Sequence, residues 1–174
     1  KYQFILPSFK MSKIFSTNTD LKGSLKYSVS GVSQKRNTNV TENYLINDFN
    51  YESESFITKK GFKNDFSIMF KNTSKKGKNS SQYGDNFINK NFLSSNYTIG
   101  YPLKKESLNF NSNLSPKLSL RYSPFDTENI TNLDRKINTA NIFSNNRLGL
   151  TDSFEGGQSL TLGFDYELLK KDDQ

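Results

Sequence analysis

The feature that most constrains the fold of this chain is a strict alternation of apolar and polar residues. Residues 21–34 show it most clearly, with Leu, Tyr and Val at one parity and Lys or Ser at the other. A period of two residues is typical of a strand with one apolar and one hydrated face. The pattern returns in five further segments, at residues 43–58, 61–71, 95–103, 114–125 and 158–169. The sequence therefore predicts an all-β chain of about six to eight antiparallel strands.

The composition agrees with a β protein. Phe and Tyr supply all the aromatic residues, which make up 14% of the chain, although only 33% of the chain is hydrophobic. Disordered chains are usually poor in aromatics, and helical bundles need many Leu and Ala residues. Aromatic and β-branched residues favour strands.

The connecting segments are polar. Lys59 and Lys60 followed by Gly61 predict a tight hairpin turn. Residues 71–90 are charged and rich in Gly, Asn and Ser, which predicts an extended loop. Residues 125–140 have no strand period and predict a second long loop with room for a short helical turn. We find neither an internal repeat nor a linker, so one domain is expected.

The absence of two residue types argues against catalysis. The chain has no His and no Cys, which removes the usual general base, the commonest metal ligand and any thiolate. Asp152 and Glu155 could form an acid/base pair or contribute to a calcium site, but two loop carboxylates are too few ligands for calcium. We therefore expect no enzyme activity, no cofactor and no metal.

Strand length separates two β architectures. The alternating segments extend over roughly 9–14 residues, whereas ordinary strands average about 5–6 and a tilted membrane-spanning strand needs about 9–11. Aromatics also lie near the segment ends, as the two aromatic girdles of a membrane barrel would place them. These residues are Tyr44, Phe56, Phe92, Tyr101 and Phe125. The pattern favours an antiparallel transmembrane β-barrel, with a soluble β-sandwich as the alternative.

The net charge of +7 and a pI near 9.4 suit polyanionic partners such as anionic lipid or nucleic acid. Nucleotide bias in the gene also produces chains rich in Lys, Asn and Ile. No signal peptide and no run of about 18 apolar residues is visible in the sequence.

Two stretches carry a more specific pattern: LSPKLSLRYSP at 114–124 and NIFSNNRLGLTDSFEGGQSLTLGFDY at 141–166. They resemble the lipopolysaccharide-assembly outer-membrane protein family LptD, also called organic solvent tolerance protein. That family joins Asn-Phe-Ser-x-Asn-Arg to Asp-x-x-Glu-Gly-Gly and continues into a strand with Gly-x-x-Tyr. The residues that match in order and spacing are Asn141, Phe143, Ser144, Asn146, Arg147, Gly149, Asp152, Glu155, Gly156 and Gly157, followed by Gly163 and Tyr166. Ser153 departs from the pattern, because the family usually has Arg there.

The resemblance implies that residues 1–174 belong to the C-terminal barrel domain of such a protein, as an arc of a large barrel in the bacterial outer membrane. The family's periplasmic jellyroll domain and a signal peptide are not expected within this chain. The implied partners are lipopolysaccharide, an LptE-like plug lipoprotein, the proteins of the periplasmic lipopolysaccharide bridge and outer-membrane lipid, with no nucleic acid.

The expected function is non-enzymatic insertion of lipopolysaccharide into the outer leaflet. A generic porin or receptor barrel and a soluble basic protein that binds polyanions are the alternatives. Lys22, Lys26 and Arg121 lie on polar strand faces, so they are candidate contacts for lipopolysaccharide phosphates or ordinary hydrated cations. We expect Arg147, Asp152 and Glu155 to form a charge cluster that holds the motif loop against the barrel wall, with the glycines permitting close passage of the chain.

Overall fold

The computed structural model describes residues 2–17, 22–36, 39–128, 137–148 and 151–171, and it confirms an all-β antiparallel fold. Every strand pairing in these ranges is antiparallel. The nine strands are β1 (Gln3–Thr17), β2 (Gly23–Arg36), β3 (Thr41–Ser53), β4 (Phe56–Ile57), β5 (Lys63–Lys78), β6 (Ile88–Gly100), β7 (Leu103–Glu106), β8 (Phe110–Ser123) and β9 (Gly157–Lys170).

The strands form one sheet that is not closed. Its order is β1-β2-β3-β5-β6-β8, with β9 beyond β8, so neighbours in the chain are neighbours in the sheet. β4 continues the line of β3 along β5, and β7 continues the line of β6 along β8. Pro102 lies at the second interruption, where a residue without a backbone N–H cannot continue the ladder. β1 and β9 form the two edges of the described sheet.

The predicted hairpin at Gly61 is confirmed. Gly61 has a φ of 87° and its N–H donates to the Thr58 carbonyl at 2.9 Å, while the Thr58 N–H donates to the Phe62 carbonyl at 2.9 Å. A positive φ is readily adopted by glycine, which has no Cβ.

The predicted loop over residues 71–90 is wrong at both ends. β5 continues to Lys78 and β6 begins at Ile88, which leaves only residues 79–87 as the connection. The sequence shows no alternation at these strand ends because both faces of the strands are polar there. Thr73 and Lys75 are buried on one face, and on the other the Asn72 amide donates to Asn91 at 2.7 Å.

β1 is a strand that the alternation did not reveal. Adjacent apolar pairs, Phe4 with Ile5 and Ile14 with Phe15, break the period of two in its sequence. The pairing of β1 with β2 also shifts register between Ile5 and Ser8, which is a local irregularity that alternation cannot predict.

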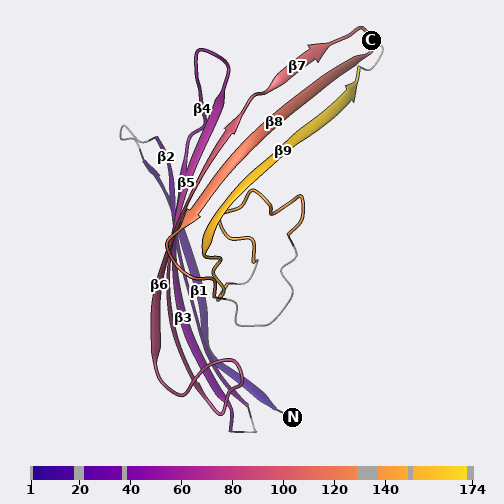
Figure 1. The fold of residues 1–174 in the computed structure, drawn as a ribbon. Helices are drawn as coiled ribbons and strands as arrows, with labels where there is room; N and C mark the ends of the chain where they lie inside the picture. The colour runs from indigo at the N-terminus through magenta and orange to yellow at the C-terminus, as the bar shows by residue number, and fades with distance from the viewer. Residues whose placement is uncertain (1, 18–21, 37–38, 129–136, 149–150, 172–174) are drawn as a thin grey trace.

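The sheet is curved, and the connection between β8 and β9 lies on its concave side (Figure 1). We refer to the described parts of this connection, residues 124–128, 137–148 and 151–156, as the covering loop. Residues 138–142 form one hydrogen-bonded turn, with the Ile142 N–H donating to the Asn138 carbonyl at 3.0 Å. Within the described ranges no helical segment has the length and apolar character needed to cross a membrane.

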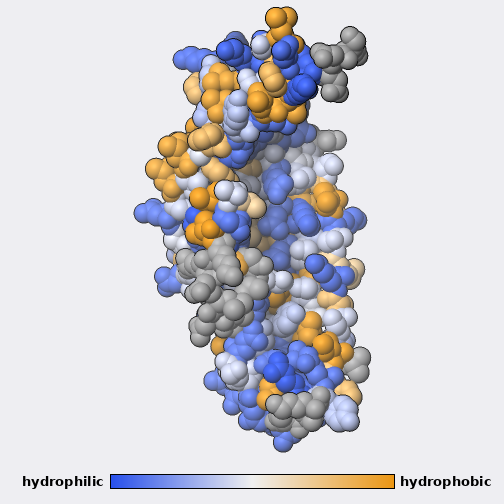
Figure 2. Space-filling view, turned by 90° about the vertical axis from the view of Figure 1, so that its right-hand side faces the viewer, coloured by the Kyte–Doolittle hydropathy of each residue, from blue (hydrophilic) through white to orange (hydrophobic). Residues whose placement is uncertain are grey.

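The two faces of the sheet have inverted polarity. The space-filling view of the concave side shows hydrophilic residues along its hollow (Figure 2). The buried residues on the concave face of the strands are mostly polar or charged: Glu42, Lys71, Thr73, Lys75, Ser94, Asn96, Ser119, Arg121, Ser123 and Thr161. The convex face instead exposes large apolar side chains, of which Leu162 is 79% exposed. Burial in this chain therefore does not follow hydrophobicity, unlike in an ordinary globular core.

The apolar residues of the convex face form a belt that crosses the strands obliquely. One row of register partners joins Leu25, Tyr51, Ile68, Ser95, Tyr122 and Gln158 across six strands. On β2 the belt begins at this row and continues toward Val29. On β9 the belt lies on the other side of this row. Its residues there are Leu160, Leu162, Phe164, Tyr166 and Leu168. The belt therefore shifts along the strands from one edge of the sheet to the other.

Candidate functional site

The covering loop packs on a small aromatic core over the concave face. Phe154 is fully buried and stacks on Phe92 of β6, with ring centroids 4.5 Å apart. Phe125 meets both rings edge-on at 5.9 and 6.5 Å. Met69 belongs to the same buried cluster. Stacked and edge-to-face rings stabilise a fold beyond the area that they bury, so this cluster anchors one end of the loop.

Arg147 and Glu155 form an ion pair within the loop. Arg147 Nη2 lies 2.5 Å from Glu155 Oε1 and Arg147 Nε lies 3.0 Å from Glu155 Oε2, so the ion pair is bidentate. The Arg147 backbone N–H donates to the same carboxylate at 3.2 Å. Burial acts to raise the pKa of Glu155, but hydrogen bonds from Arg147 and the charge of Arg121 outweigh it, so the pKa is lowered overall. The hydrogen bond to Glu155 raises the pKa of Arg147.

Asp152 does not join this pair, although the sequence suggested a cluster of three charges. Its carboxylate accepts a hydrogen bond from the Tyr83 hydroxyl at 2.9 Å, and its carbonyl accepts one from Lys75 Nζ at 2.8 Å. Burial and the bond to Asp152 raise the pKa of the Tyr83 phenol, so it remains protonated and keeps donating. Asp152 therefore binds the loop to the 79–87 connection and to β5.

Two buried lysines of β5 bind the covering loop to the concave face of the sheet. Lys71 Nζ donates to the Thr151 carbonyl at 2.8 Å and pairs with Asp48 of β3 at 2.6 Å. Lys75 Nζ donates to the Asp152 carbonyl and pairs with Glu128 at 3.3 Å. Each buried ammonium thus has a carboxylate and a carbonyl as acceptors, as a buried charge requires.

Arg121 is buried beneath the loop and binds its backbone, while a contact with lipopolysaccharide phosphate stays a prediction. Its Nε donates to the Asn145 carbonyl at 2.5 Å, its Nη2 to the Glu155 carbonyl, and its Nη1 to the Gly156 carbonyl at 3.4 Å. The planar guanidinium can bind several acceptors at once, and here they are backbone carbonyls of the loop. Arg121 is 5% exposed, unlike the other two candidate cations.

Lys22 and Lys26 are both exposed, unlike Arg121. Lys26 has the parity of the concave face of β2 and lies opposite Asn50 of β3. Lys22 precedes β2, and its carbonyl accepts a hydrogen bond from the Glu54 N–H at 2.9 Å. The covering loop contacts neither residue through a described hydrogen bond, so the structure does not bring them together with the motif.

The glycines of the motif permit close passage of the chain. A Cβ on Gly156 would overlap the Phe125 carbonyl oxygen, and Gly157 has a φ of 75°. Gly163 of β9 faces the Phe143 ring, from which a Cβ would be 3.0 Å away. Gly149 lies outside the described residues.

The other motif residues fix the loop by polar contacts. The Asn96 amide donates to the Phe143 carbonyl at 3.0 Å, and the Asn146 amide donates to the Ser153 carbonyl at 3.2 Å. The Asn138 N–H donates to the Asn141 side chain at 2.9 Å, and the Asn141 N–H lies in the same turn. Ser153 is fully buried, so the arginine that the resembled family carries would not fit at this position without a rearrangement.

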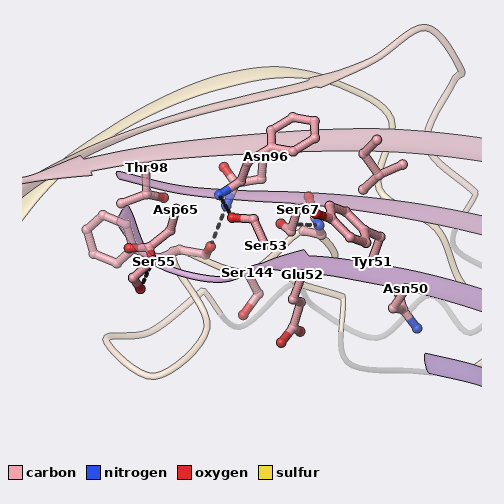
Figure 3. Close-up of a pocket in the computed structure, with 14 residues that line it drawn as sticks. Asn50, Tyr51, Glu52, Ser53, Ser55, Asp65, Ser67, Asn96, Thr98 and Ser144 are labelled. Atoms are coloured by element: carbon pink, nitrogen blue, oxygen red, sulfur yellow. Dashed lines mark hydrogen bonds between the residues drawn. The ribbon is translucent and has the colours of Figure 1, made fainter. Parts of the chain in front are cut away.

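A polar pocket of about 470 Å³ lies beside the loop on the concave face. Its walls come from β3, from β5, from β6 and from residues 143–145 of the loop. In Figure 3, Asp65, Ser55 and Thr98 lie toward one end of the pocket, and Asn50 lies toward the other. A hydrogen bond of 2.8 Å from the Asn145 amide to Ser67 ties the loop to β5 at this pocket.

Several of these residues were missed by the sequence analysis. Lys71, Lys75 and Asn96 belong to no motif, and the sequence predicts their segments to be loop or hydrated strand face. A cation at the polar parity of a strand is normally exposed, and only the loop that covers it makes it a structural residue. Among the described residues, no group of three or more acidic side chains is placed to hold a metal ion.

No protein-family model matches this chain, and no curated protein or solved structure is significantly similar to it.

Proposed function

We propose that this chain is a section of the wall of a large outer-membrane β-barrel that passes lipopolysaccharide to the outer leaflet without catalysing a reaction. The proposal combines the inverted polarity of the sheet with the resemblance of residues 114–124 and 141–166 to the LptD family. It places the convex face against outer-membrane lipid and the concave face toward the lumen.

The oblique apolar belt is the observation that carries the membrane assignment. Its centre moves from Tyr27 on β2 to Phe164 on β9, on opposite sides of the register row through Leu25 and Gln158. With about 4.8 Å between strands and 3.4 Å per residue, this shift of eight residues over five strand spacings corresponds to strands inclined by about 45–50° from the perpendicular to the belt. Strands of membrane barrels tilt by about 35–45° from the membrane normal.

The concave face suits a lumen that admits a glycolipid headgroup. Its strands present hydroxyl, amide and charged side chains, and the covering loop adds further polar groups. Barrels that conduct polar solutes have polar interiors, and loops that fold into the lumen restrict passage. The covering loop is placed to narrow the lumen in this way.

The open edges favour an arc over a complete small barrel. Unpaired backbone groups on β1 and β9 could not remain unsatisfied in lipid, so each edge needs a further strand. In the proposed assembly these strands come from the remainder of the same barrel. A plug lipoprotein like LptE and the periplasmic bridge proteins would be its partners, as the resembled family implies.

Membrane extraction tests the barrel assignment. Membranes of the bacterium that makes this protein are washed with urea and then solubilised with detergent. We expect the full-length protein to remain with the membrane in urea and to enter solution only with detergent. Release by urea alone would contradict a membrane barrel and favour a soluble protein that binds polyanions.

Depletion of the full-length protein tests the transported substrate. We expect surface lipopolysaccharide to fall and newly made lipopolysaccharide to accumulate inside the outer membrane. A loss of small-solute uptake with normal surface lipopolysaccharide would instead identify a porin or receptor barrel.

A further inference from the structure

We propose that the polar pocket beside the covering loop binds a sugar ring that is rich in hydroxyls and carries no acidic group. The inference rests on the proposed function, and it names the part of the glycolipid that the concave wall recognises. The structural feature behind it is a preformed pocket between β3, β5, β6 and residues 143–145, lined by both hydrogen-bond donors and acceptors.

The first argument is the chemistry of the lining. Amides and hydroxyls each donate and accept hydrogen bonds, whereas carboxylates only accept. A sugar ring presents several hydroxyls that do both, and it therefore matches a wall of mixed groups better than a wall of cations. No Lys or Arg lines this pocket, so a phosphate group would find no counter-charge there. The polar residues that line it include Asn50, Glu52, Asp65, Asn96, Thr98 and Ser144.

The second argument is that cations nearby are already paired. An adjoining cavity of about 320 Å³ shares Asp65, Thr98 and Phe143 with the pocket and contains two lysines. Lys117 pairs with Asp165 at 2.7 Å, and Lys63 pairs with Asp65 at 3.6 Å. Neither cavity offers an unpaired cation among its lining residues, which disfavours an acidic ligand at both.

The third argument is preorganisation. The loop wall of the pocket is held by hydrogen bonds from Asn96 to the Phe143 carbonyl, from Asn145 to Ser67 and from Arg121 to the Asn145 carbonyl. These bonds leave the side chains of Asn50, Glu52 and Ser144 without a hydrogen-bond partner among the described residues. A pocket with fixed walls and uncommitted polar groups loses little entropy when a ligand binds.

The fourth argument is the aromatic wall. Phe143 lines both cavities, and its ring lies beside Gly163 with Lys117 Nζ 4.3 Å from the ring centroid. An aromatic face beside polar groups offers the C–H side of a sugar ring an apolar surface while its hydroxyls are hydrogen-bonded. The pocket therefore combines both contacts that a pyranose needs.

Ligand-observed NMR on the full-length protein tests the proposal. The protein is purified in a detergent without a sugar headgroup, and saturation transfer is measured with glucose, galactose and glucosamine, with glucose 6-phosphate as the acidic probe. We expect transfer to at least one of the three sugars in the millimolar range and weaker transfer to glucose 6-phosphate. Transfer that is strongest to glucose 6-phosphate, or none to any sugar, would overturn the proposal.

Matched variants locate the binding. Glu52→Gln removes the charge of one uncommitted acceptor and Asn50→Ala removes one uncommitted amide, so the double variant should weaken binding about tenfold. Glu54→Gln is the control, because Glu54 is exposed close by and does not line the pocket. Equal binding by both variants would show that the sugar binds elsewhere and would refute the assignment.

The outcomes separate the proposal from the proposed function. A protein that resists urea extraction and whose depletion lowers surface lipopolysaccharide, yet binds no sugar, retains the proposed function and loses the pocket. Sugar binding by a protein whose depletion leaves surface lipopolysaccharide unchanged retains the pocket and loses the transport function.

Discussion

Arg147 and Glu155, eight residues apart, form a two-point ion pair at 2.5 and 3.0 Å against the concave face of the sheet. Glu155 is 2% exposed, and its backbone carbonyl also accepts a hydrogen bond from Arg121 of β8. Glu155 thus binds both its own loop, through Arg147, and the sheet, through Arg121. The ion pair is the most direct structural explanation for the Arg and Glu of the motif.

Replacing Glu155 with Gln should detach the loop. The variant leaves the Arg147 guanidinium partly buried without its carboxylate, and breaking a buried pair in this way costs about 3–5 kcal/mol. We expect faster cleavage of residues 124–156 by proteinase K and a lower urea midpoint in detergent micelles. The double variant Arg147→Met, Glu155→Met should be less destabilised than either single variant. A double variant that is as unstable as the sum of the singles would show that the two residues do not interact.

The same pair predicts loss of loop stability in acid. The pKa of Glu155 in the folded protein is lowered from its ordinary value of 4.5, so the folded state favours the ionised form. Its stabilising contribution is present above pH 4.5 and is lost as the pH falls through the lowered pKa. Protease resistance of the loop should therefore decline below pH 4.5 in the native protein. In Glu155→Gln this part of the pH dependence should be absent, and its persistence would assign the effect to another carboxylate.

Arg121→Lys should weaken the loop although it keeps the charge. An ammonium cannot reproduce the planar fork that reaches the carbonyls of Asn145, Glu155 and Gly156. We expect a loss of about 2 kcal/mol, taken from the cost of leaving buried acceptors unpaired, measured by urea titration. Lys26→Met is the matched control, because Lys26 is exposed and should leave the midpoint unchanged. A stable Arg121→Lys variant with reduced lipopolysaccharide transport would contradict this structural role and support Arg121 as a phosphate contact.

Two adjacent glycines should respond differently to alanine. Gly156→Ala places a Cβ on the Phe125 carbonyl and should prevent the loop from packing, which proteinase K cleavage would detect. Gly157→Ala meets no atom within 4 Å but must hold a φ of 75°, which costs about 1–2 kcal/mol. Gly84→Ala, which meets no atom and has no positive φ, should have no effect. Equal tolerance at all three positions would contradict the close passage at Phe125.

A lysine on the convex face should report contact with lipid. Leu162→Lys places a charge in the apolar belt and should cost about 2–4 kcal/mol if the residue lies near the bilayer midplane. Glu167→Lys, on the opposite face of the same strand, is the control. The measurement is the fraction of protein folded into bilayers, read from its heat-modifiable mobility on gels. If Leu162→Lys folds into bilayers as well as the control does, the belt does not face lipid.

The motif itself shows the limit of sequence reasoning at the candidate site. Its spacing suggested that Arg147, Asp152 and Glu155 act together, but the fold pairs only Arg147 with Glu155. Asp152 meets Tyr83, which comes from a connection some 69 residues earlier in the chain. A contact of that kind depends on how the loop folds across the sheet, and no local pattern encodes it.

The sequence by itself determined the strands that alternate clearly and the faces of those strands, because a period of two decides which side chains share a face. It also marked Gly61 as a turn and Gly156 as a site of close passage, since both properties belong to the residue type. Only the tertiary structure decided which polar residues are buried. The sequence predicts a loop beyond Lys71, whereas Thr73 and Lys75 of β5 are buried, and the covering loop supplies a carbonyl and a carboxylate to Lys75. Burial of a polar residue requires partners, and those partners are brought from distant parts of the chain.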